Sequence, residues 1–592
     1  MYKRILFVGP LFVLLMSVLG SCRPDTIEVK ASQAVSTDAI VYVEKLSLSF
    51  FSEDFKQENI LLQEINASDL SFISKGKFEF FNQIIREITR LDDVGNSADL
   101  NVSLHLMGKD DISPIFYINA AAELSGDMLI EEFNRLYADI PENSTRTYDG
   151  MKIWEIQTGD KNEYGNLSLA IIHGLLLVSD QSVLVEDAIR TFKSNSGLSE
   201  SEDFGVLAEV AGKYVQGNIY INFSKFPGLI SKYLSLDKLQ NSPFRGGLFA
   251  NMAEYDIDVD NERVVLSGMA TSSDSSVGII NAFRGQNSVR TEVIDHIPSN
   301  ASEFKIFGIS DFKLFRNELL LQLRYIDQLR DFESEDERLI RQGGESLFDI
   351  ILNVMKDEVA WCKMDIGGED DYSEIVFVKL KSRSEAIKQL ETYWSKLVSS
   401  NQKGEEDLLY KYQLDEQSVF DIYSFPDKYY QSTYLGNYFK KHFALYENYL
   451  ILSDSKNAIS RTIYHNVLHK TLINDPAFKK VNDLIPSNIN ILIYKNPEQY
   501  FYSIENAYSE LIEKDAEKVA EVLNIIPALL VQFSYEDEKF YSSLAMHYSE
   551  GYNEATGTVW ESLLDTVVKM KPVFVENHYT GEQEIIIQDA ND

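Results

Sequence analysis

Two histidines four residues apart, His465 and His469, have the spacing with which one helix face can hold a metal ion. The surrounding pattern predicts a helix over residues 461–470, which would place both rings on that face. The residues between them are Asn-Val-Leu, so the glutamate of a zinc-protease motif is absent, and no third ligand is evident. We therefore interpret both as surface or packing histidines.

Three aspartates at alternate positions, Asp256, Asp258 and Asp260, suggest a calcium-binding loop. Such a loop, begun at Asp256, requires glycine at its sixth position and glutamate at its twelfth. The sequence has Asn261 and Ser267 there instead. Acids that alternate with apolar residues are typical of a strand with one face in solvent. We therefore predict a β-hairpin and no metal ligand.

Other catalytic and cofactor-binding motifs are missing from the sequence. It contains no GxSxG, Walker A, GxGxxG or CxxC motif, so we predict no catalytic residue and no cofactor site. Its two cysteines are Cys22 and Cys362. Cys362 ends an apolar, helix-like stretch in which no basic residue is arranged to activate the thiol. This predicts a buried structural cysteine.

The N-terminal residues have the pattern of an export signal. Lys3 and Arg4 precede an apolar run over residues 5–18, which is too short to remain in a bilayer as a spanning helix. The run ends in Leu-Gly-Ser-Cys at residues 19–22, which resembles the lipobox of bacterial lipoproteins. That resemblance implies cleavage before Cys22 and attachment of lipid to its sulfur.

We therefore expect a lipoprotein signal peptide over residues 1–21 and a tether over residues 22–36. The tether is polar and lacks apolar periodicity. Arg23 stands where an inner-membrane retention aspartate would follow the cysteine, so the expected location is the outer membrane, on its periplasmic or surface face. The predicted contact with the membrane is the N-terminal lipid.

Composition describes the body of the protein in broad terms. The 592-residue chain is 44% hydrophobic, which is enough for two or more hydrophobic cores. Its formal net charge is −37. So acidic a chain repels nucleic acid and anionic lipid, and we predict no nucleic-acid partner.

Two parts of the sequence repeat the same order of features. Residues 169–180 and 443–454 align without a gap, and each reads as a strand, a polar turn and a strand ending in Ser-Asp. Farther along, residues 256–268 and 532–544 each read as a hairpin with an acidic turn. Chance rarely matches several elements in order, so we predict an internal duplication.

The expected fold class is α+β, because each repeat mixes antiparallel strands with amphipathic helices. We expect two tandem pseudo-repeats of antiparallel sheet with packed helices, over residues 37–290 and 297–550. The Ser-Asp pairs at residues 179–180 and 453–454 are predicted to cap the helices that follow them.

Three of these strand patterns are similar to a family of bacterial envelope proteins known by a domain of unknown function, DUF3352. They are Val-Tyr-Val at residues 41–43, Trp-Glu-Ile at residues 154–156, and the strand with its capped helix beginning at residues 175–180. The resemblance implies an envelope protein over residues 37–550. The family is functionally uncharacterised, so it implies no site residues.

Residues 551–592 follow the second repeat. Residues 558–570 read as a helix that Pro572 ends, and residues 573–575 and 584–588 read as strands. The last strand has two interpretations. It adds to an existing sheet edge, or it is the entry strand of a further β domain.

The sequence leaves three functions open. We favour a lipid-anchored, non-catalytic envelope protein that binds or scaffolds an envelope protein partner, and a shallow aromatic-rich face would fit this function. The first alternative is a hydrolase of an envelope polymer with carboxylates at the repeat junction, which requires a cleft with converging, desolvated acids. The second is a carrier of an apolar ligand, which requires an enclosed apolar cavity.

Overall fold

Runs of β-branched and aromatic residues form antiparallel strands in both of the compact units into which the chain divides. The structure is a computed structural model, and it describes residues 29–47, 50, 58–68, 100–108, 111–119, 131, 144–157, 166–235, 250–272, 278–325, 328–366, 372–401, 404, 406–415, 417–426, 440–504, 508–548, 572–578 and 583–588. Unit 1 comprises Met1–Leu46, Gly76–Met107 and Asp111–Ser201. Unit 2 comprises Ser47–Lys75, Gly108–Asp110 and Glu202–Asp592.

Unit 1 contains one antiparallel sheet. In spatial order its strands are β1 (Val41–Leu46), β2 (Leu100–Met107), β3 (Asp111–Asn119), β7 (Leu175–Ser179), β6 (Asn166–Ile172), β5 (Met151–Gln157) and β4 (Ser144–Tyr148). Helix α6 (Ser182–Ser194) packs on β6 and β7 through buried Leu184, Val185, Ala188 and Ile189. That spacing gives the helix one apolar face.

The predicted tether over residues 22–36 is wrong for its described part. Residues from Val29 onward fold against unit 1, with a 3-10 helix, η1 (Ala31–Gln33), and buried Ala31, Ala34 and Val35. The Val35 carbonyl accepts a hydrogen bond of 2.8 Å from the Leu198 amide, next to a second 3-10 helix, η3 (Leu198–Glu200). Small apolar side chains three and four residues apart form a buried face even in a mostly polar segment.

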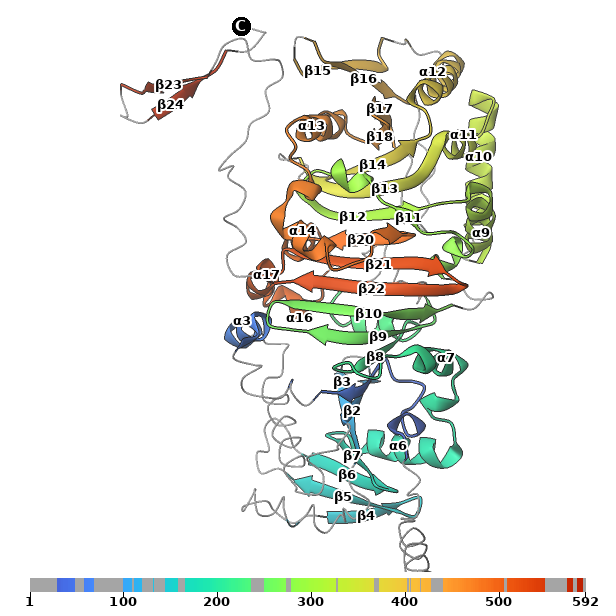
Figure 1. The fold of residues 1–592 in the computed structure, drawn as a ribbon, viewed down its shortest axis with the longest axis vertical. Coiled ribbons are helices and arrows are strands. Elements are labelled where there is room, and N and C mark those ends of the chain that lie inside the picture. The colour runs from blue at the N-terminus through green and yellow to red at the C-terminus, as the bar shows by residue number, and fades with distance from the viewer. Residues whose placement is uncertain are drawn as a thin grey trace, which may run out of the picture. The chain divides into compact units, whose positions relative to one another are not determined.

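Unit 2 contains a long antiparallel sheet that Figure 1 shows as a ladder from β15 to β8. In spatial order its strands are β8 (Asn218–Asn222), β9 (Met252–Val259), β10 (Arg263–Thr271), β22 (Lys539–His547), β21 (Ala528–Glu536), β20 (Ile491–Lys495), β12 (Ala301–Gly308), β13 (Met355–Asp365), β14 (Tyr372–Leu380), β18 (Tyr449–Ser453), β17 (His442–Tyr446), β16 (Val419–Ser424) and β15 (Leu409–Gln413). A short pair, β11 (Val289–Arg290) and β19 (Asn488–Ile489), lies outside this order.

Helices cover both faces of the central strands of unit 2. One face, which includes Trp361 and Val376, joins a core with α9 (Phe312–Tyr325), α10 (Leu329–Gly343), α11 (Leu347–Val354) and α12 (Arg383–Ser400). The other face, which includes Cys362 and Ile375, joins a core with α13 (Lys456–Val467) and α14 (Pro476–Asn482). Adjacent residues of a strand point to opposite faces, so the middle segments of these strands carry apolar residues toward both cores.

The remaining helices of unit 2 are shorter or lie nearer the ends of the sheet. They are α3 (Ile60–Ser68), α7 (Glu202–Val210), α8 (Phe226–Ile230), α15 (Pro497–Ser503), α16 (Glu510–Glu513), α17 (Ala516–Asn524), η5 (Ile279–Phe283), η6 (Val293–Asp295) and η7 (Leu472–Asn474). Among the residues that the structure describes, no helix is long and apolar enough to cross a bilayer. The predicted signal peptide and Cys22 lie outside the described residues.

The α+β class is confirmed, and so are the hairpins on which it depended. Residues 169–180 form β6, a turn and β7, and residues 443–454 form β17, a turn and β18. His173 (φ 46°), Gly174 (φ 89°) and Glu447 (φ 47°) have the left-handed backbone of tight hairpin turns. The hairpins predicted over residues 256–268 and 532–544 are β9–β10 and β21–β22.

Two local predictions are wrong. Ser179 and Ser453 end strands rather than cap helices: α6 begins after Gln181, and α13 begins after Ser455, whose hydroxyl accepts from the Ala458 amide. Cys362 lies in strand β13 rather than in a helix, although its thiol is buried as predicted. A central strand covered on both faces carries an unbroken apolar run, which periodicity does not distinguish from a buried helix.

The two compact units do not coincide with the predicted repeats over residues 37–290 and 297–550. Strands β8, β9 and β10 come before residue 290 but belong to unit 2. The reason is that β10 pairs along its length with β22, from Arg263 opposite His547 to Ala270 opposite Phe540. This ladder makes the three strands part of the sheet of unit 2.

The described part of residues 551–592 is a separate hairpin. Strand β23 (Val573–Glu576) pairs with β24 (Gln583–Ile586), and the predicted helix over residues 558–570 lies outside the described residues. In the described residues these two strands pair with each other, and the addition of the last strand to an existing sheet edge stays a prediction. The interpretation as the entry strand of a further β domain likewise stays a prediction.

Candidate functional site

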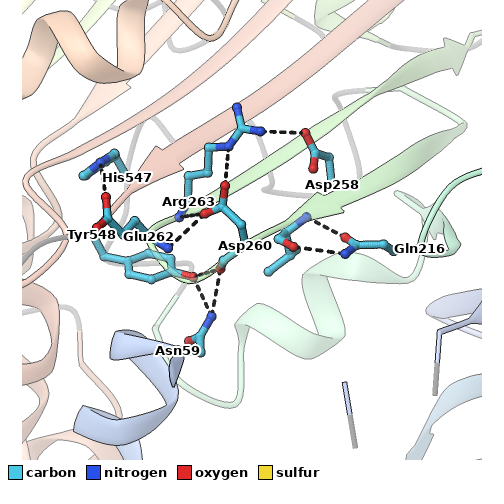
Figure 2. Close-up of polar contacts among 9 residues, drawn as sticks. Asn59, Gln216, Asp258, Asp260, Glu262, Arg263, His547 and Tyr548 are labelled. Atoms are coloured by element: carbon cyan, nitrogen blue, oxygen red, sulfur yellow. Dashed lines mark hydrogen bonds and ion pairs between the residues drawn. The ribbon is translucent and has the colours of Figure 1, made fainter. Parts of the chain in front are cut away.

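The three aspartates of the β9–β10 hairpin serve different partners. Asp260 accepts hydrogen bonds of 2.9 Å from the Glu262 and Arg263 amides and one of 2.8 Å from Arg263 Nε (Figure 2). Burial raises the pKa of Asp260, but these hydrogen bonds lower it by a larger amount, so the pKa lies below its ordinary value. Asp258 lies 3.3 Å from Arg263, and Asp256 instead accepts from the Gly212 amide and from Asn218, each at 2.7 Å.

These contacts hold the hairpin together rather than form a metal site. No group of three or more His, Cys, Asp or Glu side chains in the described part of the chain could hold a metal ion. Asn59 and the Tyr548 hydroxyl each donate to the Asp260 carbonyl oxygen, at 3.1 and 2.7 Å (Figure 2). They tie the segments before α3 and after β22 to the hairpin turn.

His465 and His469 do not share a helix face. Helix α13 ends at Val467, and His469 follows it with a left-handed backbone (φ 54°). His465 lies within the helix and is buried. The predicted packing role fits His465, while the paired-ligand geometry is not formed.

Two serine–histidine pairs have the distance of a nucleophile and its general base. Ser103 Oγ lies 2.8 Å from His105 Nε2 in unit 1, and Ser424 Oγ lies 2.8 Å from His442 Nδ1 in unit 2. All four side chains are buried, and the exposed fraction of Ser103 is 0%. A substrate does not reach such oxygens, so both pairs are polar contacts within the cores.

Carboxylates also converge close to the junction of the predicted repeats. Glu292, Asp357 and Glu358 surround the Lys379 ammonium at 2.8, 3.3 and 3.5 Å. Glu358 is 1% exposed and accepts further hydrogen bonds from the Glu292 amide and from the Tyr449 hydroxyl at 2.9 Å. The hydrogen bond from Lys379 lowers the pKa of Glu292. These acids are paired with a cation, which is the arrangement of a structural ion cluster.

A cluster of basic side chains occupies one face of the central strands of unit 2. Glu303 and Lys305 are two residues apart on β12, so they share that face. Lys363 on β13 and Lys495 on β20 lie directly opposite Glu303. We call Glu303, Lys305, Lys363 and Lys495 the lysine patch.

Each lysine of the patch lies over an aromatic ring. The Nζ atom of Lys305 is 4.8 Å from the centre of the Trp361 ring, that of Lys363 is 5.0 Å from Tyr372, and that of Lys495 is 3.0 Å from Tyr500 in α15. An aromatic face attracts an ammonium group and orders its flexible stem. The rings therefore hold the three cations in defined positions.

Three ammonium groups surround the one carboxylate of the patch. Lys495 donates to Glu303 at 3.0 Å. Burial raises the pKa of Glu303, but Lys495, Lys305 and Lys363 lower it, and the net pKa is lowered. Burial lowers the pKa of Lys305, Glu303 and Glu374 act to raise it, Lys495 lowers it, and the net pKa is lowered. Part of the Lys305 side chain remains accessible. Burial likewise lowers the pKa of Lys495, and Glu303 opposes this. With each group in its ordinary charge state the patch has three cations and one anion, on a chain whose net charge is −37.

No family model, curated protein or solved structure matches this chain. The resemblance to the DUF3352 family stays a prediction, and no site residue is taken from a relative. The lysine patch is defined by this chain's own residues.

Sequence reasoning did not find the lysine patch. Its four residues come from three strands that are far apart in the chain, and register between such strands is not written in a local pattern. One signal was present: Glu-Phe-Lys-Ile at residues 303–306 alternates charged and apolar residues, which is typical of a strand with one polar face.

Proposed function

We propose that this protein is a lipid-anchored component of the cell envelope, in the outer membrane, that binds a partner without transforming it. The observation that carries the binding role is the lysine patch. Its cations are held in position by aromatic rings and have a charge opposite to that of the chain. Electrostatic complementarity of this kind directs a partner to one place on a surface. The proposed partner presents acidic groups to the patch.

The anchor rests on the Leu-Gly-Ser-Cys motif at residues 19–22, which follows a basic and then an apolar segment. Replacing Cys22 by serine removes the sulfur that would be acylated. We expect Cys22→Ser to abolish labelling by a radioactive or alkyne fatty acid and to release the protein from the membrane fraction as soluble or uncleaved chain. Membrane partition equal to that of the wild type would contradict the anchor.

We also propose that the body of the protein arose by tandem duplication. The strand order β1, β2, β3, β7, β6, β5, β4 in unit 1 has the same connections as β12, β13, β14, β18, β17, β16, β15 in unit 2. In each series three strands that are consecutive in the chain come first, and the next four strands follow in the reverse of their order in the chain. This correspondence supports the duplication.

Matching hydrogen bonds support the same proposal. Ser179 Oγ accepts from the Gln181 amide and donates to the Pro114 carbonyl oxygen. Ser453 Oγ accepts from the Ser455 amide and donates to the Glu374 carbonyl oxygen. These bonds have equal lengths, 3.1 and 2.8 Å in both cases. A chance likeness of strand order would not bring such side-chain contacts with it.

The binding role is tested by site-specific crosslinking in native membranes. A photoreactive amino acid at position 363 should crosslink to a specific partner, because Lys363 is an accessible member of the patch. The matched control is position 152, where another lysine lies over a tryptophan, Trp154, in unit 1. Equal crosslinking from both positions, or none from position 363, would contradict a partner at the patch.

A further inference from the structure

The ammonium of Lys305 is the least satisfied charged group of the lysine patch. Among the described residues, no carboxylate oxygen lies within 4.0 Å of its Nζ atom, and its close contact is the Trp361 ring. An ammonium group has three N–H donors, and a ring face satisfies at most one side of it. Leaving such a group partly desolvated costs free energy unless something else pairs with it.

Glu303 and Glu374 stabilise the Lys305 ammonium only from beyond 4.0 Å, so no carboxylate of the described residues is in direct contact with it. Glu303 is already hydrogen-bonded to Lys495 at 3.0 Å. Residues directly opposite each other on neighbouring strands are about 5 Å apart, and residues two apart on one strand are about 7 Å apart. One oxyanion above the sheet is therefore within reach of Lys305 and at least one of the other two lysines.

We infer that the lysine patch is an oxyanion-binding site, in which Lys305 binds one carboxylate, sulfate or phosphate group of the ligand. The inference deepens the proposed function by naming the chemical group that the partner presents. Oxyanion binding at the patch does not depend on the membrane anchor.

The rest of the chain limits which anionic ligands can bind. At physiological salt the field of a charge extends about 8 Å, so the patch attracts an anion at close range, whereas a chain of charge −37 repels an extended polyanion. The partner that fits presents one anionic group within otherwise neutral surroundings, such as an acidic sugar unit or a phosphate monoester. Nucleic acids and polyphosphates are excluded on the same ground.

A second explanation of Lys305 is that its stem only covers Trp361. Lys152 of unit 1 offers the comparison, because its Nζ atom lies 4.9 Å from the Trp154 ring on an exposed strand position. If covering the ring is the whole role of both lysines, methionine should replace either one equally well. If Lys305 binds an anion, only its replacement changes ligand binding.

The experiment measures anion binding to the full chain by calorimetry and by thermal stabilisation, at constant ionic strength. The probes are inorganic phosphate, sulfate and acetate, which separate the three chemical sources. We expect saturable binding of at least one probe to the wild type. We expect at least tenfold weaker binding to Lys305→Met and to Lys305→Gln, and no change for Lys152→Met.

Unchanged binding to both Lys305 variants, equal loss in Lys152→Met, or no saturable binding to the wild type would overturn the inference. Circular dichroism of each variant establishes that it is folded, and the glutamine variant keeps the test valid if methionine perturbs the strand. Anion binding together with failed crosslinking at position 363 would contradict the proposed partner and leave the oxyanion site standing. Crosslinking without anion binding would do the reverse.

Discussion

Protonation of His442 should destabilise unit 2 as the pH falls below the ordinary pKa of histidine. The imidazole is buried on β17, and its Nδ1 lies 2.8 Å from Ser424 Oγ. Burial lowers its pKa from 6.5 to about 4, with further lowering by Lys441 and Lys456 and an opposing effect of Asp454. The folded protein therefore keeps this ring neutral where the unfolded chain would already have protonated it.

The sign and size of the effect follow from proton linkage. Between pH 6.5 and about 4 the unfolded chain binds one more proton than the folded protein at this site, so the free energy of unfolding falls as the pH falls. Each pKa unit corresponds to about 1.4 kcal/mol, which gives a loss of about 3 kcal/mol across the window. Above pH 6.5 both states are neutral and the site contributes no pH dependence.

His442→Asn removes the titration and keeps a polar atom near the position of Nδ1. Hydrogen exchange of peptides from β16 and β17 should be compared between variant and wild type at each pH, so that intrinsic exchange rates cancel. Between pH 7 and pH 4 the free energy of unfolding of the wild type should fall by about 3 kcal/mol relative to that of His442→Asn. The control is His173→Asn, at an exposed turn of unit 1. A difference between His442→Asn and wild type that does not change with pH would refute the reasoning.

Hydrogen exchange also tests three further expectations. Lys379→Met should lower the free energy of local unfolding in β13 and β14 by about 3 kcal/mol because Glu358 loses its cation, and adding Glu358→Gln should recover part of that loss. Unchanged exchange in the single variant would show that Lys379 does not stabilise the buried Glu358. Ser179→Ala and Ser453→Ala should each cost about 1 kcal/mol in their own strands, and a clearly unequal cost would weaken the duplication. Gly268→Ala should destabilise β9 and β10 by about 1–3 kcal/mol, since its Cβ would lie 2.0 Å from the Glu254 carbonyl oxygen; unchanged exchange there would contradict that clash.

The hairpins could be predicted because their information is local. Apolar runs on both sides of His173-Gly174 and Glu447-Asn448 leave room only for a two-residue turn, and the backbone adopts the left-handed conformation that such turns need. The first residue of the helix that follows each hairpin could not be predicted in this way. Ser179 resembles a cap in sequence, but its hydroxyl is used by the neighbouring strand through Pro114.

The candidate site depended on information that no local pattern contains. Lys363 and Lys495 meet Glu303 only because β13 and β20 pair with β12 in one particular register. A shift of one residue would turn those lysines to the opposite face of the sheet. The prediction of a helix-like stretch at Cys362 is wrong for a related reason. Its strand is buried on both faces, so the sequence lacks the alternation of polar and apolar residues that indicates a strand.

The ladder between β10 (Arg263–Thr271) and β22 (Lys539–His547) has a consequence for how the chain matures. A ribosome makes β10 long before β22, so during synthesis the outer edge of β10 waits without its native neighbour. An open strand edge of this kind is a template for pairing with the wrong chain. The sheet of unit 2 can be completed only after Lys539–His547 has been synthesised. Folding of this protein should therefore require a holding factor, and nascent chains halted before residue 539 should aggregate.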